Sequence, residues 1–313
     1  MQFVSIFKYE LDSFIKFKIS QGCKGSYFIA LARQLDRILI QKNEKTFSAI
    51  DCEKWRTKLK SESESAHYRR VNFSKHFFTF LRLKKYDVSI PSDVAFIPSG
   101  FRAHIYSRDE LHRYFIAVDT FSQNLSVRMR LQIPVIFRLL YSTGMRIGEI
   151  LNIKKKHVDF ETNSIFVPVS KNSKERIVFL SSSMGKLLKC YRDKTFDKID
   201  DDDYIFQDSY CKKLNLSTLG YHHRRFLKLA NIPYVGNFKG PRIHDFRHTF
   251  AVNSFIQLLK SGLKINVALP VLCKYLGHTS IEATEDYIQI VKNLFPEMIE
   301  PFEKKIFYIF KDL

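Results

Sequence analysis

A stretch without helical periodicity divides this sequence into two regions that have it. Residues 89–104 contain Pro91, Pro98 and Gly100, and their apolar residues do not recur at helical spacing. On both sides, apolar residues recur three or four positions apart over long segments. The pattern predicts a helical domain over residues 1–88, a linker over 89–104, a second domain over 105–294 and a tail helix over 295–313.

The charge of the sequence indicates a polyanionic partner. The 313 residues include 51 Lys and Arg against 32 Asp and Glu, so the formal net charge is +19. Both regions share the excess, which favours a folded protein that grips a nucleic acid over an enzyme with a basic tail. The alternative is a lysine-rich solvated surface without a partner.

Secreted and membrane proteins are excluded as leading interpretations. No apolar stretch approaches the ~18 residues of a membrane span, and charged residues follow Met1 too soon for a signal peptide. The five cysteines are scattered, without the close pairs of a disulfide framework or a zinc cluster. We therefore expect a cytoplasmic protein without a membrane partner.

The first region is predicted to be entirely helical. Its periodic segments are 10–43, which glycines divide into two helices, 48–61 and 66–84. Basic side chains lie on or just past the last segment, where they are placed to bind a nucleic acid. The residues expected to do so are Arg69, Arg70, Lys75 and Arg82.

The second region is predicted to be mainly α with a small β-sheet. Residues Ser107–Glu110 form a capping-box pattern that opens a helix. The segments 165–169 and 176–180 have strand character and flank a polar turn. Further helices are expected at 134–142, 184–193, 217–229, 245–259, 270–276 and 282–294.

Three short clusters combine Arg or His with residues typical of turns. They are Thr143–Glu149 (TGMRIGE), Ile243–His248 (IHDFRH) and Tyr275–Ser280 (YLGHTS). In the first, Arg146 follows a glycine at a helix junction, where a guanidinium can leave the core and bind a ligand. The alternative for Arg146 is an ion pair with Glu149.

The second cluster favours a phosphate over a metal ion. His244 and Arg247 share a helix face, and His248 joins His244 one turn later. A histidine pair at this spacing is compatible with zinc, but Arg247 would place a fixed cation beside the metal and no HExxH glutamate is present. No metal is therefore expected.

The third cluster places a histidine at a helix start. His278 precedes the capping-box pattern Thr279–Glu282, and the exposed amides of a helix start bind phosphate well. Tyr287 follows about two turns into that helix. Its ordinary interpretation is a half-buried aromatic side chain, and its position relative to His278 is what favours a role in chemistry.

In this order the clusters resemble those of the tyrosine recombinase family, which includes phage integrases and Xer-like proteins. The family pattern is TG-hydrophobic-R-x-x-E, a hairpin Lys, H-x-[LF]-R-H-T-[FW]-A, LGH-[ST] and T-x-x-Y. This sequence matches it as STGMRIGEI, SKNSKER, HDFRHTFA, YLGHTS and TEDYI. The match covers residues 107–294, and the first region is similar only in general character to the family's core-binding domain.

The resemblance implies a site-specific recombinase that cleaves and rejoins double-stranded DNA through a 3′-phosphotyrosine, without metal, ATP or another cofactor. It implies a homotetramer on DNA and leaves accessory proteins open. Lys171 corresponds to the hairpin lysine, with Lys174 as the competing choice, and Glu149 supports the site. The implied catalytic residues are Arg146, Lys171, His244, Arg247, His278 and Tyr287.

Two other functions remain open from the sequence. One is a type IB topoisomerase-like enzyme, which nicks and reseals DNA with similar residues, and the other is a non-catalytic DNA-binding relative. The stretch between Arg247 and His278 is longer than the family commonly shows, and no further arm-binding domain is expected before the first helices. The apolar stripe of residues 295–313 is expected to pack either on its own domain or on a neighbouring protomer.

Overall fold

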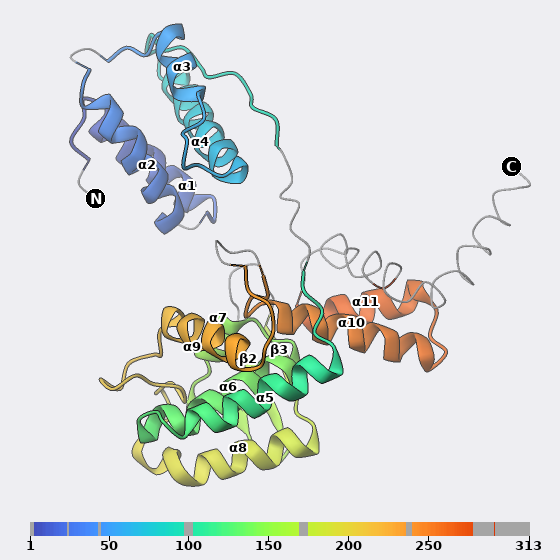
Figure 1. Ribbon diagram of the computed structural model, residues 1–313. Helices are drawn as coiled ribbons and strands as arrows, with labels where there is room; N and C mark the ends of the chain where they lie inside the picture. Colours follow the sequence, from blue (N-terminus) through green and yellow to red (C-terminus); the bar gives the residue numbers. More distant parts are fainter. Residues whose placement is uncertain are drawn as a thin grey trace, which may run out of the picture. The chain divides into compact units, whose positions relative to one another are not determined.

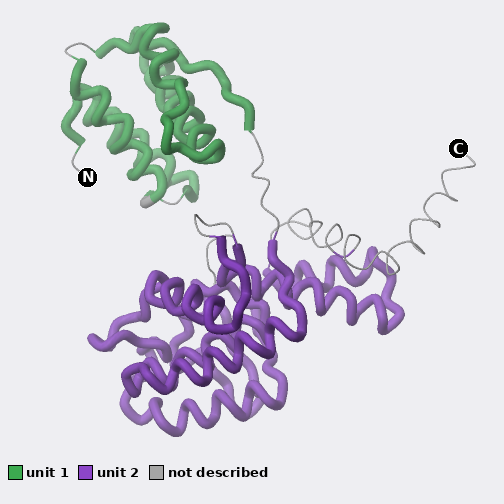
Figure 2. Tube along the Cα trace, in the orientation of Figure 1, with its two compact units in different colours: residues 1–101 green, residues 102–313 purple. Residues whose placement is uncertain are grey.

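The boundary between the two units of the chain falls between residues 101 and 102, within the segment 89–104 (Figure 2). This computed structural model describes residues 3–23, 25–42, 45–96, 103–168, 175–235, 240–277 and 291. Among these residues, no helix is long and apolar enough to cross a membrane.

The first unit is built from four helices around an aromatic core. They are α1 (Lys8–Ser20), α2 (Gly25–Leu39), α3 (Ala49–Arg56) and α4 (Glu64–Leu83) (Figure 1). Phe14 of α1 packs edge-on against Phe73 and Phe77 of α4, with ring centroids 5.8 Å and 5.5 Å apart. Such pairs add to the free energy gained by burying the rings. The core therefore fixes α1 against α4.

Helix α3 is shorter than the 48–61 segment predicted. The Ser48 hydroxyl accepts the amide proton of Asp51, whose carboxylate accepts the Ser48 amide, so a capping box starts the helix. Asp51 therefore completes the cap that Ser48 provides. The helix ends at Arg56, and Thr57, with φ −59° and ψ 126°, is no longer helical.

The chain after α4 runs along the first unit. Val88 pairs with Phe47 in a parallel bridge, and the Ser89 amide donates to the Phe47 carbonyl at 2.6 Å. Further on, Lys75 of α4 forms an ion pair with Asp93 at 2.6 Å. The start of the 89–104 segment is therefore held by contacts within this unit.

The second unit is mainly helical with one small sheet (Figure 1). Its longest helices before the sheet are α5 (Arg108–Ser122) and α6 (Val127–Thr143), followed by the short α7 (Ile147–Leu151). After the sheet come α8 (Ser182–Thr195), α9 (Leu216–Leu229), α10 (Asp245–Lys260) and α11 (Ile265–Leu276). Single 3₁₀ turns lie at Lys155–His157 and Phe196–Lys198.

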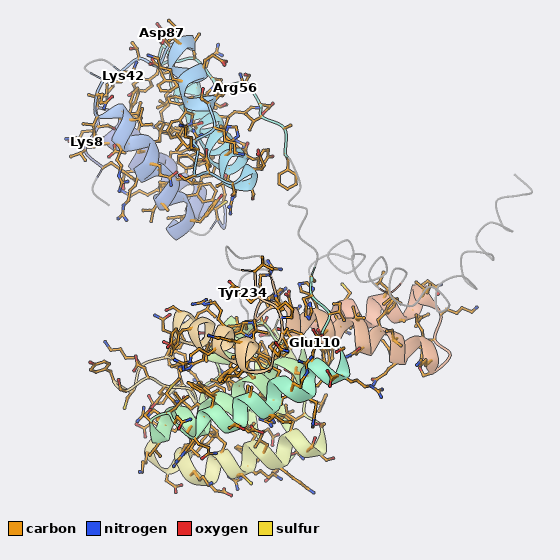
Figure 3. The ribbon with its side chains drawn as sticks, viewed as in Figure 1. Lys8, Lys42, Arg56, Asp87, Glu110 and Tyr234 are labelled. Carbon is orange, nitrogen blue, oxygen red and sulfur yellow. The ribbon has the colours of Figure 1, made fainter. Side chains whose placement is uncertain are left out.

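The predicted cap of α5 is confirmed. The Ser107 hydroxyl accepts the Glu110 amide proton at 3.1 Å, and the Glu110 carboxylate accepts the Ser107 amide at 2.8 Å. Figure 3 draws the side chains and labels Glu110 at the beginning of this helix. Two amides that would otherwise lack a helical acceptor are thereby satisfied.

The sheet has three antiparallel strands in the order β1–β2–β3. They are β1 (Val158–Asp159), β2 (Ser164–Val167) and β3 (Arg176–Phe179), with Ile165 opposite Val178. Both of these side chains are buried, so one face of the hairpin belongs to the core. The two predicted strands are present, and β1 was missed because two residues are too few to display an alternating pattern.

Two helices begin earlier than predicted, and each contains a proline. α6 starts at Val127 rather than Pro134, and α11 starts at Ile265 rather than Pro270. A proline normally favours a first turn, because it lacks the amide that an interior position donates. Here both helices continue through the proline, and buried side chains lie on both sides of it.

The second unit contains two apolar clusters. The larger extends from Tyr106 to Phe246 and includes the inward faces of α5, α6 and the sheet. The smaller lies between α10 and α11, and Val291 is completely buried in it. Along α10 the larger cluster ends at Phe246 and the smaller one begins at Ala251, and the buried Arg247 lies between them in the sequence.

Candidate active site

Arg146 stands at a tight turn between α6 and α7. The preceding Gly144 has φ 61°, and a Cβ there would lie 2.3 Å from the ring of Phe250, so the turn requires glycine. The Glu149 carboxylate accepts the Arg146 amide at 2.9 Å and its guanidinium at 3.0 Å. The Arg146 side chain is still 27% exposed, so the ion pair leaves part of the cation at the surface.

Glu149 also binds an arginine from the sheet. Its two carboxylate oxygens accept the two terminal nitrogens of Arg176 at 3.2 Å and 2.8 Å. Burial by itself raises the pKa of Glu149, but the hydrogen bonds and charge of Arg176, followed by the Arg146 amide, lower that pKa to about 2. Glu149 is therefore ionised at neutral pH and joins the α7 turn to β3.

Arg247 is almost completely buried, with 1% of its surface exposed. One terminal nitrogen donates to the Gly144 carbonyl at 2.7 Å, and the other donates to the Leu276 carbonyl at 2.8 Å. Because Gly144 lies two residues before Arg146, and Leu276 lies two residues before His278, these bonds bring three sequence clusters to one place.

His244 lies just before α10, with part of its surface exposed. The surrounding protein and the charges of His248, Arg247, Arg242 and Arg146 lower its pKa from 6.5 to about 3. The pKa of His248 is lowered to about 4, first by burial and then by Arg242 and Arg247. Both imidazoles are therefore neutral at pH 7.

The structure thus brings together Arg146, Glu149, His244 and Arg247 among the predicted site residues. Lys171, Lys174, His278 and Tyr287 lie outside the described residues. The described Val291, four positions after Tyr287 in the sequence, packs with α10 and α11. Among the described residues, no group of three or more His, Cys, Asp or Glu is arranged to hold a metal ion.

Sequence reasoning missed Arg176 as part of this cluster. Its side chain is 9% exposed, and its buried Nε has no hydrogen-bond partner among the described residues. A signal was present, since Arg176 and the buried Val178 lie two positions apart on one strand and therefore share a face. An arginine on the inward face of a strand predicts a buried carboxylate partner.

One of the four residues expected to contact a nucleic acid is buried. Arg70 is 4% exposed, stacks on Trp55 and donates to both oxygens of Glu62 at 2.8 Å. This corrects the expectation for Arg70, because its guanidinium is used inside the first unit. Arg69 and Arg82 are exposed, and Lys75 is half-buried beside Asp93.

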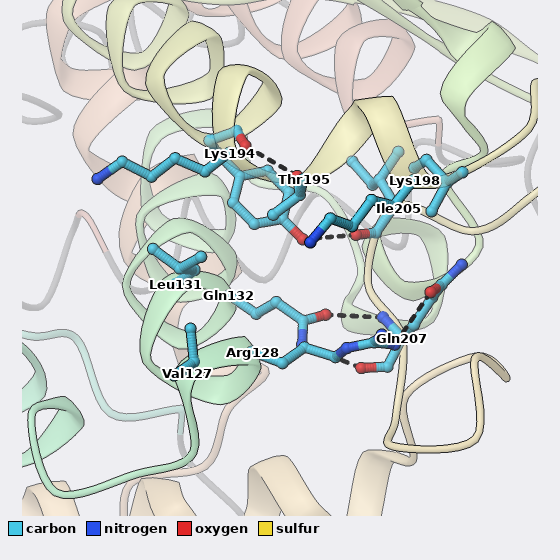
Figure 4. A pocket seen from close by; sticks show the side chains of 11 residues that line it. Val127, Arg128, Leu131, Gln132, Lys194, Thr195, Lys198, Ile205 and Gln207 are labelled. Atoms are coloured by element: carbon cyan, nitrogen blue, oxygen red, sulfur yellow. Dashed lines mark hydrogen bonds between the residues drawn. The ribbon is translucent and has the colours of Figure 1, made fainter.

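A cavity of about 240 Å³ lies elsewhere in the second unit, between α6, α8 and the segment before α9. In Figure 4, Gln132 and Gln207 lie next to one another in its wall, and two hydrogen bonds of 2.9 Å and 2.7 Å join them. None of the predicted catalytic residues lines this cavity. The charged cluster is therefore separate from it.

Comparison with known proteins relates the second unit to a recombinase family. Residues 107–293 match the family model described as Phage integrase family. A tyrosine recombinase of Agathobacter rectalis is 28% identical over 255 residues, which are 78% of this chain and 78% of that protein. Tyrosine recombinase XerA of Saccharolobus solfataricus is 32% identical over 197 residues, covering 62% of this chain and 56% of that protein.

A solved structure has a similar fold over both units. It is the XerH site-specific recombinase bound to its difH substrate in a pre-cleavage complex, with a TM-score of 0.63. The alignment covers 90% of this chain and 81% of that chain at 17% sequence identity. At this identity the likeness establishes a shared mainly helical fold with a small sheet.

Proposed function

Because the chain belongs to the phage integrase family and is a tyrosine site-specific recombinase, we propose that the cluster around Arg247 binds the scissile phosphate of double-stranded DNA. The observation that carries this proposal is that Arg247 donates to the Gly144 carbonyl, two residues before Arg146, and to the Leu276 carbonyl. The charges of Arg146 and Arg247 also act on His244. Three arginines face one carboxylate here, and Arg146 remains partly exposed. The excess of positive charge favours an anion with several oxygens.

Each arginine has a distinct part in this proposal. Arg146, which is partly exposed, donates to the non-bridging oxygens of the phosphate. Arg247, which is almost completely buried, adds positive charge beneath the phosphate site. Negative charge that grows on the phosphate oxygens in the transition state is stabilised by donors already held in place, typically by several kcal/mol. Glu149 and Arg176 orient these donors and do not react.

His244 acts as the proton acceptor in this proposal. It is neutral at pH 7, as a base must be, because the surrounding protein and nearby cations lower its pKa. The negative charge of a bound phosphodiester offsets those cations and raises the pKa of His244 toward the range useful for a base. The substrate would therefore help to activate the base.

The reaction is a reversible transesterification. The Tyr287 phenolic oxygen attacks phosphorus as His244 takes its proton, a 3′-phosphotyrosine bond forms and the bond to the 5′ oxygen breaks. Lys171, which lies between β2 and β3 in the sequence, gives a proton to that oxygen, and His278 donates to the phosphate. The attack of a 5′ hydroxyl from another strand reverses these steps and releases Tyr287.

We further propose that residues 1–88 contact the same duplex as the catalytic domain, that residues 89–104 link them, and that four copies assemble on paired sites. In support, the basic excess extends over both regions. The bond energy stored in the phosphotyrosine removes any need for ATP. Accessory proteins are left to the particular recombination system.

The experiment is covalent trapping on a duplex with a nick near the cleavage point, which lets the short fragment that carries the freed 5′ hydroxyl diffuse away. The wild-type chain should form a DNA adduct that survives denaturing electrophoresis. Tyr287→Phe should bind DNA equally well and form none, because only the nucleophilic oxygen is removed.

The matched control is Tyr275→Phe. Tyr275 stacks on Phe250 with ring centroids 5.6 Å apart, and its pKa is raised by burial, so it is a poor nucleophile. Its variant should keep the adduct. An adduct formed by Tyr287→Phe would refute the assignment of the nucleophile.

A further inference from the structure

A buried hydrogen-bonded chain runs from α5 through α9 to the turn that carries His244. The Tyr114 hydroxyl lies 2.8 Å from Nδ1 of His223, and Nε2 of His223 lies 3.2 Å from the Pro241 carbonyl oxygen. Tyr114 is 0% exposed and His223 is 3% exposed, so water does not compete for these bonds. Pro241 is three residues before His244. The chain of hydrogen bonds therefore ends on the segment that leads directly into His244.

The partners determine which ring nitrogen carries the proton. A carbonyl oxygen only accepts hydrogen bonds, so Nε2 of His223 must be the donor to Pro241. Burial lowers the pKa of His223 to about 4, so the ring is neutral at pH 7. Nδ1 is then the acceptor, and the Tyr114 hydroxyl donates to it.

The same two side chains also hold the turn through Phe246. Phe246 lies between His244 and Arg247 in the sequence, and its ring is fully buried. Its centroid is 5.0 Å from that of Tyr114 and 6.0 Å from that of His223. The turn is therefore held by the hydrogen bond from His223 to Pro241, before His244, and by the packing of Phe246, after His244.

We propose that His223, whose Nε2–H donates to the Pro241 carbonyl while Tyr114 donates to its Nδ1, is a positioning residue that fixes His244 and Arg247 relative to the scissile phosphate. The inference rests on the proposed function and adds a residue that touches no DNA. Small displacements of catalytic groups lower rates strongly, because the reaction requires aligned atoms. Loss of the Pro241 bond should therefore slow cleavage more than it weakens DNA binding.

His222 offers a matched control on the same helix. It is 8% exposed and packs face to face with Phe226, with centroids 6.1 Å apart. Its Nδ1 has no hydrogen-bond partner among the described residues. His222 and His223 are thus both buried histidines of α9, and only His223 is bonded to the turn before His244.

Two amide substitutions separate the nitrogens of His223. In His223→Gln the side-chain amide reaches the position of Nε2 and can still donate to Pro241, whereas in His223→Asn it reaches only the position of Nδ1. With saturating nicked duplex, we expect the Gln variant to keep most of the adduct-forming rate. The Asn variant should lose on the order of 10- to 100-fold, with unchanged DNA affinity.

The controls are His222→Asn, which should cleave like the wild type, and Tyr114→Phe, which keeps the ring and removes the donor. Imidazole ¹⁵N spectra should show a protonated Nε2 at His223 in the wild type, and in Tyr114→Phe the Nδ1 signal should shift because the donor to that nitrogen is removed. This measurement needs no activity, so it tests the tautomer even if the Asn variant unfolds.

Equal rates for the Asn and Gln variants would overturn the inference, as would an equal loss in His222→Asn or an unprotonated Nε2 in the wild type. Failure of the proposed function looks different. In that case the wild-type chain itself forms no adduct at Tyr287, whatever stands at position 223.

Discussion

Glu149 and Arg176 form a two-pronged ion pair across 27 residues of sequence, with bonds of 3.2 Å and 2.8 Å. The carboxylate stands in the first turn of α7, and the guanidinium stands at the start of β3. The pair therefore fixes the turn that presents Arg146 relative to the hairpin formed by β2 and β3.

Glu149→Gln should lower the free energy of unfolding by about 3 kcal/mol, because two guanidinium groups lose their shared countercharge in a buried setting. Urea denaturation at pH 7 measures the change. Glu161→Gln, at an exposed position, is the control and should unfold like the wild type. Equal stability of the two variants would show that the pair contributes little.

The stabilisation from Glu149 should disappear in acid. Its folded-state pKa of about 2 lies below its ordinary value of 4.5, so its contribution is complete above pH 4.5 and is lost as pH falls toward 2. The difference in stability between the wild type and Glu149→Gln should narrow over that range. If the free energies of unfolding of the two proteins change with pH in parallel, Glu149 does not contribute to stability through its ionised form.

Arg70 and Arg69 should respond differently to the same substitution. Arg70→Met leaves the Glu62 carboxylate, which is 9% exposed, without its buried partner and should cost about 3 kcal/mol or more in unfolding experiments. Arg69→Met removes an exposed cation and should spare stability. It should weaken DNA binding and reduce the slope of log K against log salt by about one.

A fragment that begins at residue 104 should bind DNA more weakly than the full chain and with a shallower salt dependence. Fewer phosphates are neutralised when the basic first unit is missing, so fewer counterions are released. Titrations at several salt concentrations measure the slope. If the slope is unchanged, the first unit is not part of the DNA interface.

Removal of residues 296–313, which lie outside the described residues, should spare folding and single-site binding if the tail docks on a neighbouring protomer. Cooperative synapsis should then be lost. Circular dichroism and analytical ultracentrifugation with DNA separate these effects. If the truncated protein loses its fold, the tail packs in the core of its own protomer. If the truncated protein still forms tetrameric synapses, the tail is not exchanged between protomers.

Covalent cleavage should persist in excess chelator. Arg242 and Arg247 act on His244 and His248 with positive charge, and that charge opposes a metal cation at the histidine pair. Adduct formation with and without EDTA measures this. Activity that falls in EDTA and returns with a divalent ion would favour a metal site at these histidines.

Local patterns predicted much of this fold, and contacts between distant segments were the part they missed. The Ser107–Glu110 cap and the strand pair depend on neighbouring residues, and both are present. Arg146 had two predicted partners, a ligand and Glu149, and the ion pair forms while part of the side chain stays exposed. A sequence window that contains β3 cannot reveal that Arg176 meets α7.

The burial of Arg70 has a similar cause. Its position on a basic helix indicated a nucleic-acid contact, but helix α4 turns this side chain toward Trp55 and the carboxylate of Glu62. Charge counts alone do not distinguish an arginine that faces solvent from one that fills a polar pocket. The partner, Glu62, lies eight residues away and outside the same helix.

The two hydrogen bonds from Arg247 to backbone carbonyls join the two apolar clusters of the second unit. Gly144 ends a helix of the larger apolar cluster, and Leu276 ends a helix of the smaller one. Removing this guanidinium would remove both hydrogen bonds between the two clusters and would also weaken the phosphate site. The activity lost in Arg247→Ala is therefore a sum of two effects, and phosphate binding accounts for only one of them.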